Sequence, residues 1–283
     1  MGKIIAICNQ KGGTGKTTTV VNLGAYLAAA NKSVLIVDLD PQANATSGLG
    51  IDKYSIKKST YHILIEEIGL EEIVLPTALE NLKIAPANLD LTGAEVELVG
   101  MLGREYRLKK VLDGHKNNYD FIFVDSPPSL GLLTVNALGA AHSALIPVQC
   151  EYYALEGLTQ LINTIHLVRE NINSGLRIEG ILLTMADFRT NLTNQVIAEV
   201  QRYFRQQANF STDYEQSPRV YETIIPRNIR LSEAPSFGKP IILYDRSSIG
   251  AQKYQELTNE ILGITIDSFN HVSQGTETVK EGE

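Results

Sequence analysis

A glycine-rich loop near the N-terminus has the residue types needed to bind a chain of phosphates. An apolar run, Ile4 to Cys8, leads into the loop, and a helix-like stretch follows it. Backbone N–H groups of glycines and the positive end of a helix can surround phosphate oxygens. The second lysine of the loop is placed to reach the outer phosphates, and the threonine after it to bind Mg²⁺. The loop and helix start read Lys11-Gly12-Gly13-Thr14-Gly15-Lys16-Thr17-Thr18.

This loop departs from the common pattern G-x-x-x-x-G-K-[ST], because Gln10 stands where the pattern has its first glycine. A second lysine, Lys11, stands at the start of the loop instead. A glycine-rich turn without a ligand is the alternative interpretation. The order of strand, loop, Gly-Lys-Thr and helix favours a phosphate site, because the motif requires that context.

Three aspartates end apolar runs and could work with the loop. Asp125 ends the run 121–125, and Asp38 and Asp40 end the run 34–40. A carboxylate in such a place can hold a metal-bound water near the β- and γ-phosphates. Strand alternation puts Asp38 and Asp40 on one side, so that one can support the magnesium shell and the other can orient the attacking water. A single aspartate there is equally compatible with capping a helix, but three beside a phosphate loop favour catalysis.

The elements that must position these residues alternate between short apolar runs and longer amphipathic ones. Most of the apolar runs lack clean alternation, which is typical of strands covered on both faces. This rhythm predicts an α/β fold with a mostly parallel twisted sheet, helices on both faces and ligands at the carboxyl ends of the strands. The expected strands are Lys3–Asn9, Ser33–Asp38, Leu82–Pro86, Asp120–Asp125, Ser143–Val148, Ile178–Thr184 and Tyr221–Ile225, and the expected helices are Gly15–Ala30, Leu102–Gly114, Ala154–Asn171 and Asn191–Gln207.

Composition excludes several classes of protein. With 43% apolar and 20% charged residues, the 283-residue chain is globular rather than disordered or fibrous. The longest apolar runs are far too short to span a membrane. Two cysteines, Cys8 and Cys150, cannot build a disulfide framework or a four-cysteine zinc site, and a reducing cytoplasm is the simplest location.

The distribution of charge leaves room for an anionic partner. The net charge of −7 argues against a surface coated in basic groups. Residues 185–260, however, hold nine basic and nine acidic side chains, so the negative excess lies in the rest of the chain. Any anionic surface is therefore expected to meet the C-terminal third.

The loop resembles the deviant Walker A loop of the ParA/MinD superfamily of P-loop ATPases. Further segments are specifically similar to the ParA/Soj ATPases, which partition chromosomes and plasmids. The resemblance covers about residues 1–264, which we expect to form a single P-loop NTPase domain, followed by a polar, disordered tail at 265–283. The segments are DLDPQANAT (38–46), DSPPS (125–129), PVQCEYYALEG (147–157) and IPRNIRLSEAP (225–235).

The resemblance implies an ATP-dependent switch with ATP and Mg²⁺ as cofactors. Two subunits close face to face on the nucleotides, and the lysine at the position of Lys11 reaches the partner subunit's phosphates. Lys16 is the ordinary P-loop lysine, and Asp40 positions the attacking water. The nucleotide is bound by residues 11–18 and the adenine by Pro226 to Asn228. The magnesium site is assigned to Thr17, Asp38 and Asp125.

The resemblance also implies that the ATP dimer binds duplex DNA without sequence preference. The matching basic positions are Arg189 and Arg230, and a ParB-type centromere-binding protein stimulates slow hydrolysis and releases the dimer. A solvated arginine or a salt bridge is the alternative for each residue, because isolated basic residues do not identify a phosphate contact. The location implied is cytoplasmic and nucleoid-associated.

Some features depart from the family or leave alternatives open. The connection Gln206 to Arg219 is longer than in most Soj-like proteins, and we expect it and the tail to be mobile. A strand beginning at Lys3 leaves no room for the N-terminal DNA-binding domain of longer ParA proteins. The main alternative is a MinD-like positioning ATPase without DNA binding, which needs an amphipathic C-terminal helix that this sequence does not supply. An iron–sulfur carrier and a metabolic ligase of the same superfamily are further alternatives. An iron–sulfur carrier needs cysteine ligands at a dimer interface, whereas we expect Cys8 to be buried in a strand.

Overall fold

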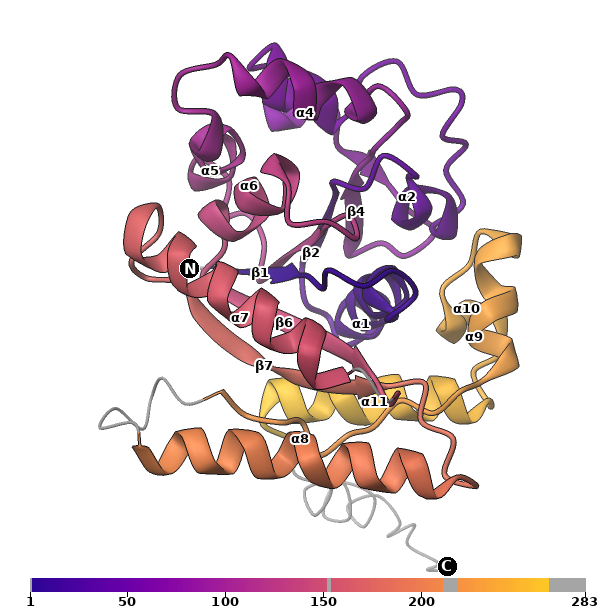
Figure 1. The fold of residues 1–283 in the computed structure, drawn as a ribbon. Helices are drawn as coiled ribbons and strands as arrows, with labels where there is room; N and C mark the ends of the chain where they lie inside the picture. The colour runs from indigo at the N-terminus through magenta and orange to yellow at the C-terminus, as the bar shows by residue number, and fades with distance from the viewer. Residues whose placement is uncertain (1, 152–153, 211–217, 265–283) are drawn as a thin grey trace, which may run out of the picture.

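The computed structural model describes residues 2–151, 154–210 and 218–264. They fold around one seven-stranded sheet in the order β3-β4-β2-β5-β1-β6-β7, with all neighbours parallel except β3 and β4 (Figure 1). The mostly parallel sheet expected from the sequence is therefore confirmed. The strands are β1 Lys3–Ile7, β2 Val34–Asp38, β3 Leu75–Pro76, β4 Leu82–Ala85, β5 Phe121–Asp125, β6 Ser143–Gln149 and β7 Arg177–Thr184.

Apolar cores lie on both faces of the sheet. In β1, Ile4 and Ala6 belong to one core and Ile5 and Ile7 to the other, because successive side chains of a strand point to opposite faces. The first core is closed by α3 Thr60–Ile65, α4 Leu91–Val99, α5 Arg107–Asp113, α6 Leu132–Ala140, α7 Ala154–Asn171 and α8 Asn191–Phe210. The second is closed by α1 Lys16–Ala29, α2 Asn44–Gly48, α9 Ile229–Glu233, the 3₁₀ turn η4 Ala234–Phe237, α10 Ile241–Tyr244 and α11 Ile249–Leu262.

Strand register brings the ends of three central strands together. Asp38 at the end of β2 is paired with Asp125 at the end of β5, which is paired in turn with Ile7 at the end of β1. The loop after β1 and the two strand-end aspartates therefore share one edge of the sheet. Ligands of open α/β sheets bind at this carboxyl edge.

The expected strand Tyr221–Ile225 is wrong. Isolated bridges at Val220 and Pro226 join this part of the chain to β7 and its end, and the Ile225 N–H donates to the Leu183 carbonyl at 2.9 Å, but no continuous ladder forms. Between them, the backbone N–H groups of Glu222 and Thr223 donate to the Glu260 carboxylate of α11, at 2.9 and 3.1 Å. These side-chain bonds take the place of a regular ladder with β7.

Two further expectations need correction. The expected helix Leu102–Gly114 is divided into a 3₁₀ turn, η2 Arg104–Tyr106, and α5, and Gly103 before the turn has a φ of 65°, which cannot continue a helix. Helix α8 extends to Phe210, so the start of the connection expected to be mobile is helical. Residues 211–217 and the tail 265–283 lie outside the described residues.

A close contact between two glycines joins α2 to η4. A Cβ atom on Gly238 would lie 2.7 Å from the Cα of Gly50, and one on Gly50 would lie 3.0 Å from the Gly238 carbonyl oxygen. Both glycines also have positive φ, at 61° and 83°. The segment that follows the aspartates of β2 is thus packed directly against the segment that carries Arg230. Within the described residues, no helix combines the length and the apolar character that crossing a membrane requires.

Candidate nucleotide-binding and hydrolysis site

The loop between β1 and α1 has the conformation that its glycines allow. Gly13 and Gly15 have φ values of 75° and 84°, which L side chains rarely adopt. The loop is held from outside by β7, where the Thr184 hydroxyl donates to the Thr14 carbonyl at 2.9 Å. The Asn9 side chain supports its start, donating to the Pro147 carbonyl and accepting from the Lys11 backbone. The backbone is therefore fixed in shape before any ligand arrives.

Lys16 begins α1 and lies almost buried between acidic groups. It is 6% exposed and its Nζ donates to the Lys11 carbonyl at 3.3 Å. Burial lowers the pKa of Lys16, and the negative charges of Asp125 and Asp40 oppose that change. The ammonium group is thus held at the loop, near both aspartates.

Asp125, predicted at the magnesium site, has a carboxylate that is buried at the end of β5 beside the loop. Its carboxylate is fully buried, and neither oxygen has a hydrogen-bond partner among the described residues. Burial and the neighbouring Asp38 raise the pKa of Asp125 well above its usual value, while Thr17 and Lys16 lower it in part. A buried carboxylate without a partner, with a hydroxyl beside it, matches the hard oxygen donors that Mg²⁺ prefers. The predicted pair of Thr17 and Asp125 is brought together at this point.

Asp38 is fully buried and held by three donors. One of its oxygens accepts from the Asp40 N–H at 3.1 Å; the other accepts from the backbone and hydroxyl of Thr46, at 2.9 and 2.7 Å. Burial raises the pKa of Asp38 to about 6, against the lowering effect of the Thr46 bonds. The Thr46 hydroxyl also accepts from the Ala87 N–H at 3.0 Å. Asp38 thus fixes the backbone of Asp40.

Asp40 faces the loop across a small cavity. It is 6% exposed, and its carboxylate accepts from the Gln42 N–H at 2.9 Å. The cavity has a volume of about 280 Å³, and both Asp40 and most of the predicted phosphate-binding residues line it. Its lining includes Gly12, Gly13, Gly15, Lys16, Thr17, Thr18, Asp40, Gln42, Asn44, Pro128 and Met185.

A second cavity of about 490 Å³ shares Gly15, Thr18 and Met185 with the first. Pro226 and Asn228, the residues expected at the adenine, line it together with apolar side chains such as Leu231. Two adjoining cavities, one with loop backbone and charge and one largely apolar, match the phosphate and base ends of a nucleotide.

Lys11 points away from these cavities in the single chain. Its ammonium group is half exposed and forms an ion pair with Glu151 at 2.6 Å. Glu151 follows β6 and also accepts from the side-chain amide of Gln149. Lys11 is therefore the one lysine of the loop whose side chain lies at the surface beside the nucleotide site, because Lys16 is buried.

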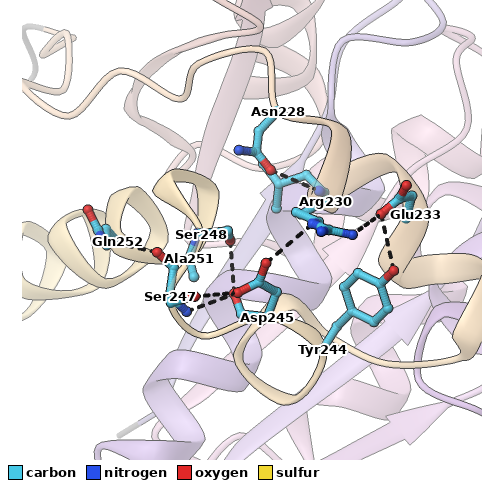
Figure 2. Close-up of polar contacts among 10 residues, drawn as sticks. Asn228, Arg230, Glu233, Tyr244, Asp245, Ser247, Ser248, Ala251 and Gln252 are labelled. Carbon is cyan, nitrogen blue, oxygen red and sulfur yellow. Dashed lines mark hydrogen bonds and ion pairs between the residues drawn. The ribbon is translucent and has the colours of Figure 1, made fainter.

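The two arginines expected at DNA are exposed, and each forms ion pairs. Arg189, with a side chain 87% exposed, contacts Asp187 at 2.6 Å. Arg230 contacts Glu233 at 2.9 Å and Asp245 at 3.4 Å (Figure 2). The segments that carry them lie side by side, because the backbone of Ala186 bonds to both Ile225 and Arg227.

Sequence reasoning did not assign several residues that support the site. Thr46 lies in the segment 38–46, but no pattern gave its hydroxyl a role. Thr184 and Met185 come from β7 and its end, and Met185 has a φ of 52°, an uncommon value for a side chain that lines both cavities. No local spacing reveals such residues, because the sheet brings them to the loop from a distance of about 170 positions.

Both cysteines are buried and free. The expectation that Cys8 is buried is confirmed, but Cys8 follows β1, which ends at Ile7, and does not lie inside the strand. Burial raises the pKa of Cys8 to about 12 and of Cys150 to about 11. Thiols with such pKa values are poor metal ligands, since the thiolate is the ligand form.

Comparisons with known proteins agree with this geometry. The sequence profile of a family described as "AAA domain" matches residues 2–178. The sporulation initiation inhibitor protein Soj of Bacillus subtilis is 58% identical over 261 residues, which are 92% of this chain and 98% of that protein. The chromosome partitioning protein ParA of Myxococcus xanthus is 53% identical, over 93% of this chain and 88% of that protein.

Solved structures give the same fold. A cobyrinic acid a,c-diamide synthase from Mycobacterium smegmatis, with bound ADP and magnesium, has a TM-score of 0.77 and 33% identity over the whole of both chains. The cell division ATPase MinD of Pyrococcus furiosus has a TM-score of 0.73 and 26% identity, over 93% of this chain and 99% of that one. The curated sequence relatives are more similar, and they include a chromosome-partitioning ATPase Soj from Treponema pallidum at 47% identity. The chain belongs to the Soj/ParA family of chromosome-partitioning ATPases.

Proposed function

We propose that this chain is an ATP-driven switch for DNA partition, in which Mg-ATP closes two subunits into a dimer that binds nonspecific duplex DNA. The observation that carries the proposal is that Lys16, Thr17 and Asp40 line a single cavity. Related structures with bound ADP, or an ATP analogue, and magnesium support ATP and Mg²⁺ as the cofactors. The identity of 58% to Soj supports partition as the process.

Each residue of the site then has a definite role in hydrolysis. The loop 11–18 binds the phosphates through its backbone, and Lys16 offsets their charge. Thr17 and Asp125 would hold Mg²⁺ with support from Asp38, and the ion, when bound, would offset charge that develops on the phosphates. Asp40 orients the attacking water, and the cavity beside Pro226 and Asn228 takes the base.

Lys11 would complete the site of the other subunit. Its side chain is at the surface and would exchange the Glu151 carboxylate for a phosphate across the dimer interface. A second cation at the phosphates makes closure depend on the nucleotide, because the phosphates supply the charge that holds it. The ATP-bound protein would thereby be a dimer and the ADP-bound protein a monomer.

DNA is the partner that the arginine surface would contact, through Arg189 and Arg230. The planar guanidinium suits phosphate oxygens, and two copies of the surface in a dimer multiply the contacts. We place the dimer on the nucleoid in the cytoplasm. A ParB-type protein would stimulate hydrolysis and release the dimer.

The test is binding to nonspecific duplex DNA with ATP, ADP or no nucleotide, at two salt concentrations. Binding should require ATP and should weaken steeply with salt, by about 0.9 log units per log unit of salt for each phosphate neutralised. Arg230→Ala should weaken ATP-dependent binding while ATP hydrolysis without DNA stays as in the wild type. Hydrolysis without DNA binding under any nucleotide would instead favour a MinD-like positioning ATPase, and lipid vesicles would be tested next.

The Thr46 hydroxyl donates a hydrogen bond to Asp38, and Asp38 in turn accepts from the backbone of Asp40. Thr46→Val should lower single-turnover hydrolysis of ATP about 10- to 100-fold, a usual effect of outer-shell partners, with little change in ATP affinity. Thr46→Ser should restore turnover because it keeps the hydroxyl.

Thr258→Val is the matched control for Thr46. Thr258 is also buried, and its hydroxyl donates to the Tyr254 carbonyl within α11; neither residue lines the 280 Å³ cavity that Asp40 lines. It should lower thermal stability without slowing turnover. A Thr46→Val protein that hydrolyses ATP like the Thr258→Val control would show that the hydroxyl does not position Asp40.

A further inference from the structure

Arg230 is enclosed by acidic side chains from two elements. Its Nη1 lies 2.9 Å from Glu233 of α9, and its Nε lies 3.4 Å from Asp245, which follows α10 (Figure 2). One guanidinium thus meets two carboxylates, and we call Glu233 and Asp245 the acidic cradle. With Arg230 inside it, the cradle carries a formal charge of −1.

The two carboxylates of the acidic cradle are themselves fixed in place. Glu233 accepts from the Tyr244 hydroxyl at 3.1 Å, and the Asp245 carboxylate accepts from the backbone and hydroxyl of Ser247, at 3.2 and 2.8 Å. The side chains of Asp245 and Glu233 are 26% and 41% exposed, whereas that of Arg230 is 54% exposed. Both acids thus have further hydrogen bonds that hold them, and the arginine is the most exposed of the three side chains.

The two carboxylates beside Arg230 weaken its contact with a polyanion such as DNA. A DNA phosphate that approaches Arg230 also approaches two carboxylates, and like charges repel. The guanidinium must break at least one of its ion pairs before it can form a bidentate hydrogen bond with a phosphate. Arg189 repeats the pattern with Asp187, which accepts two bonds from its guanidinium, at 2.8 and 2.6 Å.

We propose that the acidic cradle limits the DNA affinity of this surface, because Glu233 and Asp245 compete with DNA phosphates for Arg230. The inference rests on the proposed function, in that DNA is the partner of Arg230. A surface weakened in this way does not hold DNA as a single chain. It holds DNA when dimerisation doubles the number of arginines, so the acids make release follow loss of the dimer.

The test is the double variant Glu233→Gln, Asp245→Asn in the full chain. Glutamine and asparagine keep a carbonyl oxygen for the bonds from Tyr244 and Ser247 and remove only the charges that attract Arg230. Affinity of the ATP-bound protein for duplex DNA should rise about three- to tenfold at moderate salt, since exposed ion pairs are individually weak and a dimer contains two cradles.

A matched control separates a local effect from a change in net charge. Glu67 also pairs with two cations, Arg107 and Lys110. Both cations belong to α5, which packs on the other face of the sheet from α9 and α10. Glu72, which pairs with Lys58, is neutralised together with Glu67, so that the control also removes two negative charges. Glu67→Gln, Glu72→Gln should leave DNA affinity unchanged. An equal rise in this control would overturn the proposal, because the gain would then come from net charge.

Arg230→Ala in both backgrounds completes the experiment. It should abolish the gain of the double variant, since the cradle acts through Arg230. If Arg230→Ala weakens binding in the wild type but the double variant gains nothing, the cradle does not compete and only this inference fails. If Arg230→Ala leaves wild-type binding intact, Arg230 is not part of the DNA surface, and that part of the proposed function fails with it.

Discussion

Replacing Asp40 by alanine is expected to reduce ATP turnover at least about 100-fold and to accumulate an ATP-bound dimer. Groups that orient or deprotonate the attacking water contribute effects of this size. Asp40 lines the same cavity as the phosphate loop, yet its protein contact, to the Gln42 backbone, is local. Its removal should therefore spare ATP binding. Gel filtration with ATP measures the dimer, and single-turnover hydrolysis measures the loss of chemistry.

Asp40→Asn is the informative control, because the amide oxygen can still accept from Gln42. It should be as inactive as Asp40→Ala, since the amide cannot take up a proton or match the carboxylate charge. Hydrolysis by Asp40→Asn at the wild-type rate would show that Asp40 supports the loop structurally and does not orient the attacking water. An Asp40→Ala protein that neither binds ATP nor dimerises would likewise contradict a role confined to chemistry.

The parts of the site that lie close together in sequence were predictable. The loop from Lys11 to Thr18 carries its own signals, since glycines, a lysine and a threonine at fixed spacing require a particular backbone. Asp125 and Asp38 were found because each ends an apolar run, and parallel strands place such ends on one edge. These predictions needed only the order of the strands and their direction.

The rest depended on tertiary contacts that no local pattern records. The segment 221–225 has the apolar residues of a strand, but the Glu260 carboxylate takes two of its N–H groups. Thr46 turns back from α2 to bond Asp38, and Thr184 bonds the loop from the end of β7. The ion pairs of Arg230 arise from α9 and the end of α10, which meet only after folding.

Lys11→Ala is expected to abolish ATP-dependent dimerisation and, with it, DNA binding. In the single chain this ammonium group faces Glu151 rather than either nucleotide cavity, so ATP affinity of the monomer should change little. Glu151→Gln is the paired variant: it frees Lys11 without removing it and should dimerise at least as well as the wild type. Analytical ultracentrifugation with ATP measures the dimer, and nucleotide titration measures the affinity of the monomer. Loss of monomer ATP affinity in Lys11→Ala would mean that Lys11 serves its own subunit.

Mixing two inactive chains separates the two roles of Lys11 most sharply. In a mixed dimer of Lys11→Ala and Asp40→Ala chains, the nucleotide on the Lys11→Ala subunit keeps its own Asp40. If Lys11 crosses the interface, that same nucleotide receives Lys11 from the Asp40→Ala partner, so one site is complete and turnover returns. If Lys11 acts within its own chain, one site lacks the lysine and the other the aspartate, and the mixture stays as inactive as its components. Lys11 pairs with Glu151 at the surface and does not line the cavity that Lys16 and Asp40 share, and this leads us to expect recovery.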